Sequence, residues 1–247
     1  MSEEDRDVLA LDIGGSKLAL AQVRRDGTLG KHARQPTASI SGGDDLVAWV
    51  EAQVEQWQVR PVALGVSAGG PLDDERGMIT RWPRMEMLWN YPLSDRLRGA
   101  LPSVERVQLV NDASAACAGV AVFGVGQGLK RVLYLTISTG VGGGAVVGGR
   151  LLRGDRGNAA EFGHMVVRHD GPRCDCGAAG CLEAMASGSG LYRRLVRAGL
   201  LADEEFGWAG VGYWIKERLE QGGHREVEQI WDEALDGLAV GMVNLFN

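Results

Sequence analysis

The pattern that most constrains the fold of this chain is a strand, a glycine-rich turn and a second strand, which occurs twice. The first copy runs through residues 8–23 around the turn Gly14-Gly15-Ser16-Lys17. The second copy runs through residues 132–147 around a turn from Ser138 to Gly144. A repeat of this kind predicts two similar α/β domains.

Hydrophobic periodicity places further strands and helices around the two turns. Short apolar runs predict strands near residues 28–34, 62–66 and 107–110. Apolar residues at helical spacing predict helices over residues 44–58, 113–123, 190–198, 208–219 and from 225 toward the end. We place the predicted domains at residues 1–124 and 125–247.

Composition excludes several classes of partner. The formal net charge is −6 and 45% of the 247 residues are hydrophobic, so we expect a globular protein that binds neither nucleic acid nor an anionic membrane surface. No apolar run reaches the ~18 residues that a membrane span requires. The start Met-Ser-Glu-Glu-Asp is unlike a signal peptide, and we therefore expect a cytoplasmic location.

Residues Glu161–Glu183, here called the cysteine loop, contain three of the four cysteines. One imidazole and three thiols form a candidate metal site: His164, Cys174, Cys176 and Cys181. Four nitrogen and sulfur ligands are typical of structural zinc, and Gly177 and Gly180 supply tight turns between them. The alternatives are a disulfide, which would leave a third thiol unpaired, or a reduced loop without metal.

The two glycine turns expose backbone N–H groups that suit phosphate oxygens, although each is equally compatible with a plain hairpin. Neither matches a P-loop or a dinucleotide-binding fingerprint. Asp12 beside the first turn is a candidate Mg²⁺ ligand or a turn-capping carboxylate.

Asp112 lies where a predicted buried strand gives way to a helix, a place where ligands collect in α/β folds. It is a candidate general base for a substrate hydroxyl, with helix capping as the alternative. The neighbouring Asn111, together with Glu161 and Glu183, could hydrogen-bond a polyol.

These residues resemble the ROK family of bacterial sugar kinases, most nearly its glucokinase-like members. The most specific match is the pattern Cys-x-Cys-Gly-x-x-Gly-Cys-x-Glu, which residues 174–183 fit at every fixed position. Glu161-x-Gly163-His164 precedes it. The resemblance runs from residue 8 to the last residue.

The resemblance implies an α/β, actin-like and hexokinase-like (ribonuclease H-like) fold of two domains with an inter-domain cleft. The implied activity is the Mg²⁺-dependent transfer of phosphate from ATP to the 6-hydroxyl of a hexose, with glucose as the first candidate. The implied assembly is a homodimer. Asp112 is the implied catalytic base, and the zinc is implied to be structural with the four ligands named above. The implied sugar ligands are Asn111, Glu161, His164 and Glu183. The implied phosphate and Mg²⁺ residues are Asp12, Gly14, Gly15, Ser16, Lys17, Thr139, Gly140 and Gly142.

Two departures from the family pattern bear on substrate and donor. The stretch Arg81–Trp89 lacks a sugar-binding Asn that the family carries before a Trp. The sequence ends at Asn247, where the family continues into a strand and a glycine-rich loop that holds adenosine, so we expect an incomplete second domain. The alternatives are a polyphosphate-dependent, N-acetylhexosamine or fructose kinase of the same family, or a non-catalytic sugar-binding remnant.

Overall fold

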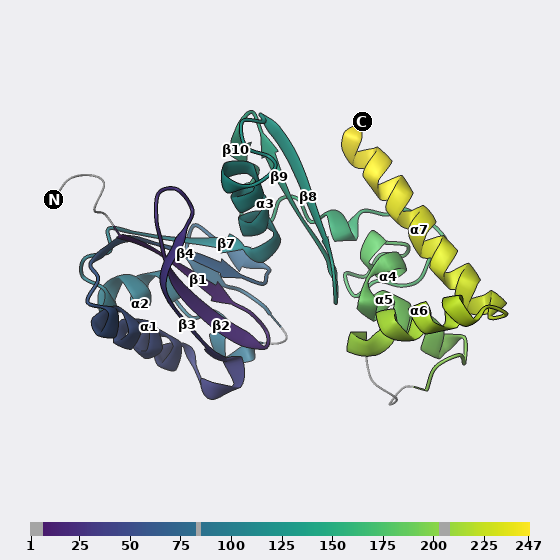
Figure 1. Cartoon of the computed structure of the whole chain (residues 1–247), viewed down its shortest axis with the longest axis horizontal. Helices are drawn as coiled ribbons and strands as arrows, with labels where there is room; N and C mark the ends of the chain where they lie inside the picture. The colour runs from purple at the N-terminus through teal and green to yellow at the C-terminus, as the bar shows by residue number, and fades with distance from the viewer. Residues whose placement is uncertain (1–6, 83–84, 203–207) are drawn as a thin grey trace. The chain divides into compact units, whose positions relative to one another are not determined.

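The computed structural model describes residues 7–82, 85–202 and 208–247. The chain divides into two compact units, coloured along the sequence in Figure 1. The first unit contains residues up to Val132 together with Val146–Ala159, and the second contains Leu133–Ala145 and Ala160–Asn247. Each unit therefore combines two separate stretches of the chain, whereas the sequence predicted a single domain boundary after residue 124. The domain limits 1–124 and 125–247 stay a prediction.

The first unit is built on a five-stranded sheet in the order β3-β2-β1-β4-β7. The strands are β1 (Asp7–Ile13), β2 (Lys17–Val23), β3 (Leu29–Pro36), β4 (Pro61–Ala68) and β7 (Arg106–Asn111). β1 pairs antiparallel with β2 and parallel with β4, and β4 pairs parallel with β7. Three parallel strands therefore end at the same edge of the sheet.

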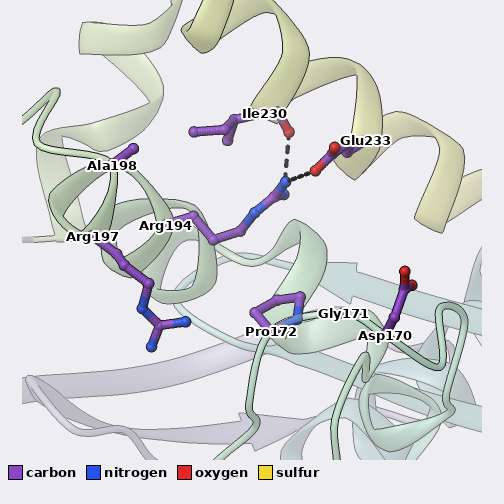
Figure 2. A pocket seen from close by; sticks show the side chains of 8 residues that line it. All are labelled: Asp170, Gly171, Pro172, Arg194, Arg197, Ala198, Ile230 and Glu233. Atoms are coloured by element: carbon purple, nitrogen blue, oxygen red, sulfur yellow. Dashed lines mark hydrogen bonds and ion pairs between the residues drawn. The ribbon is translucent and has the colours of Figure 1, made fainter.

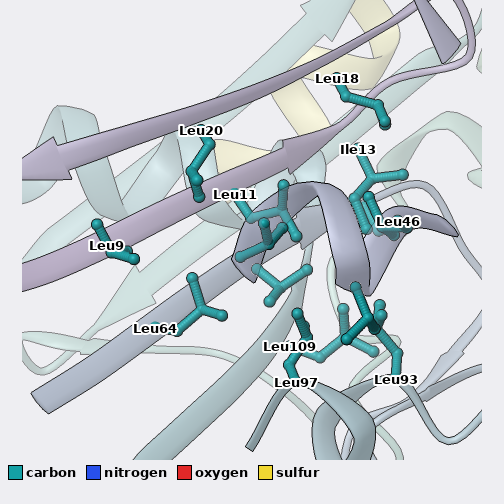
Figure 3. Close-up of a cluster of buried hydrophobic side chains, with 14 of the residues drawn as sticks. Leu9, Leu11, Ile13, Leu18, Leu20, Leu46, Leu64, Leu93, Leu97 and Leu109 are labelled. Carbon is teal, nitrogen blue, oxygen red and sulfur yellow. The ribbon is translucent and has the colours of Figure 1, made fainter. Parts of the chain in front are cut away.

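One face of this sheet carries the core of the first unit. Leu9, Leu11 and Ile13 alternate along β1 with exposed residues, as expected for a strand with one buried face. Figure 3 shows these side chains converging with those of Leu64 and Leu109 from β4 and β7. Helices α1 (Gly43–Trp57) and α2 (Leu93–Ala100) complete this core, and α3 (Asp112–Phe123) follows β7 directly. The sequence did not predict α2, nor the short strands β5 (Leu72–Asp73) and β6 (Met78–Ile79).

A three-stranded sheet contains the second copy of the repeat, in the order β10-β9-β8. Its strands are β8 (Arg131–Ile137), β9 (Val141–Val147) and β10 (Arg150–Leu151). The predicted turn was too long, because β9 begins at Val141 and only residues 138–140 form the turn. The following glycines permit close packing: a Cβ on Gly143 would lie 2.3 Å from the Phe162 ring.

The second unit is otherwise helical. Its elements are the 3₁₀ helices η4 (Phe162–His164) and η5 (Trp208–Gly210), and α4 (Leu182–Ala186), α5 (Gly188–Arg197), α6 (Val211–Gln221) and α7 (Arg225–Phe246). α7 packs through small residues, since a Cβ on Gly241 would lie 3.1 Å from Leu182. On α7, the side chains of Leu235 and Val243 are 45% and 57% exposed. The described part of the chain holds no helix that is long and apolar enough to cross a membrane.

Candidate functional site

In the first unit, polar side chains gather where the parallel strands end. Asp12 of β1 is in register with Ser67 of β4, and the next residue of β4, Ala68, is in register with Asn111 of β7. The Ser67 hydroxyl donates a hydrogen bond of 2.9 Å to Oδ1 of Asp12. Ser67 was not singled out from the sequence, where it is one serine within an apolar run. The edge of the sheet thus orients Asp12 through a neighbouring strand.

Asp112 is the first residue of α3; it keeps solvent-exposed surface, but neighbouring atoms partly desolvate its carboxyl group. Its Oδ1 accepts a hydrogen bond of 2.7 Å from the Ala113 amide, which fixes the carboxyl group at the helix start. Burial raises the pKa of Asp112 above its ordinary value of 3.8, and the negative charge of Asp12 raises the pKa further. Asp112 is therefore a stronger proton acceptor than a fully solvated aspartate.

Asn111 is the N-cap of α3. Its Oδ1 accepts hydrogen bonds from the Ala113 and Ser114 amides at 3.0 and 3.2 Å, as an N-cap side chain does. The capping role considered for Asp112 thus belongs mainly to Asn111. Its Nδ2 lies near the backbone of Gly70, and the side-chain amide keeps its N–H donors for another partner.

The first glycine turn is anchored at its base and open at its tip. The Gly14 amide donates to the Lys17 carbonyl at 3.0 Å, and the buried Thr37 hydroxyl donates to the Gly14 carbonyl at 2.6 Å. Gly15 and Ser16 are exposed, and their amides have no hydrogen-bond acceptor within the described ranges. A fixed turn with free N–H groups is suited to binding an anion.

In the second unit, the turn Ser138–Gly140 is held by two other elements. The amides of Gly188 and Ser189, at the start of α5, donate to the carbonyls of Ser138 and Thr139 at 2.8 and 3.0 Å. The carboxylate of Glu183 accepts a hydrogen bond of 2.9 Å from the Val141 amide. A Cβ on Gly140 would lie 2.5 Å from this carboxylate, so the approach requires glycine. Glu183, expected as a sugar ligand, therefore also positions the second glycine turn.

The structure brings all four predicted metal ligands together. The ligand atoms of His164, Cys174, Cys176 and Cys181 lie within 4.8 Å of one another. A tetrahedral zinc with Zn–S bonds of about 2.3 Å separates its ligands by about 3.8 Å, which matches this spacing. The closest pairs are Cys174 Sγ and His164 Nδ1 at 3.6 Å, and Cys176 Sγ and Cys181 Sγ at 3.5 Å. No thiol of the set forms a disulfide. The donor set fits zinc.

The chemistry of the thiols also favours a cation. Burial, with the neighbouring sulfur atoms, raises the pKa of Cys181 to about 12, so a thiolate there needs a positive charge beside it. Gly177 and Gly180 have φ values of +95° and +71°, as the predicted tight turns require. A Cβ on Gly180 would lie 1.4 Å from the Arg168 carbonyl oxygen, so this turn accepts no other residue.

Glu161 precedes the short helix η4 in the same unit, and His164 is its last residue. The His164 amide donates to the Glu161 carbonyl at 3.0 Å, and both side chains are exposed. Gly163 between them approaches β9 so closely that a Cβ would lie 2.0 Å from the Val141 carbonyl. Gly163 was quoted from the sequence only as part of a motif, and its physical role is to seat η4 against β9. Pro83 and Arg84, within the stretch that lacks the expected Asn, lie outside the described residues.

Known proteins resemble the chain over most of its length. The sequence model of the ROK family matches residues 8–247. A glucokinase of Thermotoga maritima is 36% identical over 195 residues, which are 78% of this chain and 60% of that protein. An N-acetylmannosamine kinase of Escherichia coli is 35% identical over 185 residues, which are 74% of this chain and 62% of that protein.

The fold has a solved counterpart. The crystal structure of a ROK hexokinase from Thermus thermophilus superposes with a TM-score of 0.82 and 34% identity, and covers 97% of this chain and 77% of that one. The predicted actin-like, hexokinase-like fold is confirmed by this similarity. The chain spans about 60% of the length of the curated relatives it matches.

Proposed function

Because the chain belongs to the ROK family, we propose that it acts as a sugar kinase that transfers the γ-phosphoryl group of ATP to the 6-hydroxyl of a hexose, with glucose as the first candidate. The observation that carries this proposal is Asp112. It is a partly desolvated carboxyl with a raised pKa beside the charge of Asp12, at the carboxyl ends of the three parallel strands. Phosphoryl transfer needs such a base, and otherwise mainly positioning and electrostatic stabilisation.

In this proposal Asp112 accepts the proton of the sugar hydroxyl as the hydroxyl oxygen attacks the phosphoryl group. The open amides of Gly15 and Ser16 bind phosphate oxygens, with Gly14 and Lys17 completing the first turn. Thr139, Gly140 and Gly142 are the corresponding residues of the second repeat. Asp12 is the proposed residue for Mg²⁺, which when bound neutralises charge on the phosphates.

The proposed sugar ligands are Asn111 in the first unit and Glu161, His164 and Glu183 in the second unit. Asn111 offers its side-chain amide, and Glu161, His164 and Glu183 offer an imidazole and two carboxylates. Zinc held by His164 and the three cysteines is proposed to be structural, because four protein ligands leave no open position for water or substrate. Its function is to fix the cysteine loop before sugar binds.

The test is a coupled assay with glucose and Mg-ATP on the wild-type chain and Asp112→Asn. General base catalysis contributes about 10²- to 10⁴-fold, so the variant should lose at least about 100-fold in kcat. Equal rates for both proteins, each shown to be folded by circular dichroism, would refute the assignment of Asp112.

A second candidate is an N-acetylhexosamine kinase, which is favoured by the similarity to an N-acetylmannosamine kinase. The same assay with N-acetylmannosamine, N-acetylglucosamine and fructose ranks the acceptors by kcat/KM, and polyphosphate in place of ATP tests the donor. A sugar-binding remnant would bind glucose in calorimetry but neither donor. The homodimer and the cytoplasmic location stay predictions, and sedimentation tests the first of them.

A further inference from the structure

The second unit contains a cavity of about 180 Å³ between the cysteine loop and α5. Pro172 and Asp175 line it from the loop, and Arg193 and Arg197 line it from the helix. A larger hollow of about 410 Å³ shares Pro172, Arg194 and Arg197 with this cavity, so the two are neighbours. Cys174, a proposed zinc ligand, also lines the smaller cavity, and the other lining residues have no role in the function proposed above.

The cavity pair is rich in positive charge, although the whole chain has a formal net charge of −6. Four arginines line the smaller cavity, namely Arg173, Arg193, Arg194 and Arg197, with Asp175 as its one acidic lining residue. The larger hollow adds Asp170 and Glu233, to which Arg168 is paired. Five guanidinium groups thus face three carboxylates.

The carboxylates do not satisfy all of these guanidinium groups. Arg194 donates to the carbonyls of Met185 and Ile230 and pairs with Glu233, as Figure 2 shows for the latter two partners. Its donors are therefore engaged within the protein. Arg197 has no hydrogen bond or ion pair with any described residue, and in Figure 2 its guanidinium extends toward the loop at Pro172.

Arg193 is only half satisfied. Its Nη1 donates to Asp175 at 3.1 Å, whereas its Nη2 is buried without any partner. In the described part of the chain, Nη2 of Arg193 is the one buried side-chain nitrogen or oxygen in this condition. A buried charged donor without an acceptor is costly, and an unseen ion is one of its ordinary explanations.

We propose that Arg193 and Arg197 bind a phosphate group in the smaller cavity. A guanidinium donates two parallel hydrogen bonds to an oxyanion, and two of them on successive turns of one helix face suit a dianion. The excess of guanidinium over carboxylate groups supplies the charge balance. The neighbouring hollow leaves room for the organic part of a phosphate monoester, so both free phosphate and a phosphorylated small molecule share this chemistry.

Binding there would tie the cysteine loop to α5. The first residues of α5 hold the turn Ser138–Gly140, and its C-terminal half carries Arg193 and Arg197. A bound phosphate would bridge the loop at residues 172–175 to this helix. The ligand should therefore stabilise the second unit without contacting Asp112. The inference is independent of the proposed kinase activity.

The experiment measures phosphate binding by calorimetry and by thermal shift at constant ionic strength, with chloride as the reference anion. The wild-type chain should gain roughly 3–6 °C in Tm at a tenfold excess of phosphate over its Kd. Arg193→Gln/Arg197→Gln should weaken phosphate binding at least about tenfold and lose the shift. The matched control Lys216→Gln/Arg225→Gln removes the same charge from exposed positions of the same unit. It should keep both the phosphate affinity and the Tm shift.

Further measurements distinguish free phosphate from a phosphate monoester and define the results that would overturn the proposal. Arg197→Lys keeps the charge but loses the planar fork, so its affinity should lie between those of wild type and the double variant. Tighter binding of glucose 6-phosphate than of inorganic phosphate would assign a monoester, and equal binding would assign free phosphate. An undiminished phosphate shift in a folded double variant would place the anion elsewhere, for example on the glycine turns, and overturn the proposal. An equal shift with chloride would overturn it too.

Discussion

The candidate sites of the two units are supported by different structural features. The first unit buries 23 hydrophobic residues in one cluster against its sheet, whereas the main cluster of the second unit buries 11. In the first unit the proposed functional residues Asp12 and Asp112 lie at or directly after the ends of strands that this core already fixes. In the second unit, the corresponding loops depend on glycines that permit close approach and on a set of metal ligands. Strands and a hydrophobic core thus support the candidate residues of the first unit. Closely packed glycines and candidate metal ligands support those of the second unit.

Metal removal should separate the two units most strongly. Structural zinc contributes about 10 kcal/mol or more of apparent binding free energy in small zinc domains, and here it would hold the cysteine loop. Chelation should abolish hydrogen-exchange protection at α4 while that of β1 changes little, and should weaken sugar binding. If both regions kept their protection after zinc was shown to be gone, the comparison would fail.

The first unit should instead be sensitive to its core. Leu11 is 1% exposed, and Leu11→Ala should lower the free energy of unfolding by about 3–5 kcal/mol, because it leaves a cavity. The matched control is Val8→Ala on the same strand, where the side chain is 38% exposed and the loss should stay below about 1 kcal/mol. Denaturant titration measures both, and similar losses would contradict the one-sided burial of β1.

A pair of glycines tests how much close backbone approach matters in the cysteine loop. Gly180→Ala should cost about 3 kcal/mol and reduce zinc content, because its Cβ collides with the Arg168 carbonyl. Gly177 has a similar positive φ but nothing within 4 Å of its Cβ, so Gly177→Ala should cost only about 1 kcal/mol. Equal effects would mean that backbone strain, and not close approach, dominates. Zinc content per chain and denaturant titration provide the readouts.

The smallest effect concerns the charge of Asp112 in the first unit. The raised pKa means that the folded state favours the protonated carboxyl, and the ionised form destabilises it once the pH rises through that pKa. Asp112→Asn keeps the acceptor oxygen without the charge, so it should be more stable than wild type at pH 7. The gain should disappear near pH 3, where Asp112 is protonated in both states. Urea titrations at the two pH values measure this, and a variant that is less stable at pH 7 would contradict the sign.

Sequence patterns predicted the strands of the first unit and the clustering of the candidate metal ligands because both are encoded locally. The short apolar run Val8–Ile13 predicts a strand, and close spacing in the cysteine loop brings three thiols together. The patterns could not reveal contacts between distant segments. The bond between Ser67 and Asp12, and the carboxylate of Glu183 on the Val141 amide, depend on strand register and tertiary packing. The second glycine turn was predicted too long for the same reason, since Gly143 serves packing and not the turn.

We infer that partial desolvation and the charge of Asp12 make Asp112 a proton acceptor at the edge of the sheet. Carbon-13 NMR titration of the aspartate carboxyl groups measures this pKa directly, with Asp112→Asn assigning the signal and Asp12→Asn removing the neighbouring charge. We predict that Asp112 has a pKa above 3.8, and that this pKa falls in Asp12→Asn without returning fully to 3.8. An Asp112 that titrates at or below 3.8 in the folded wild-type chain would contradict it.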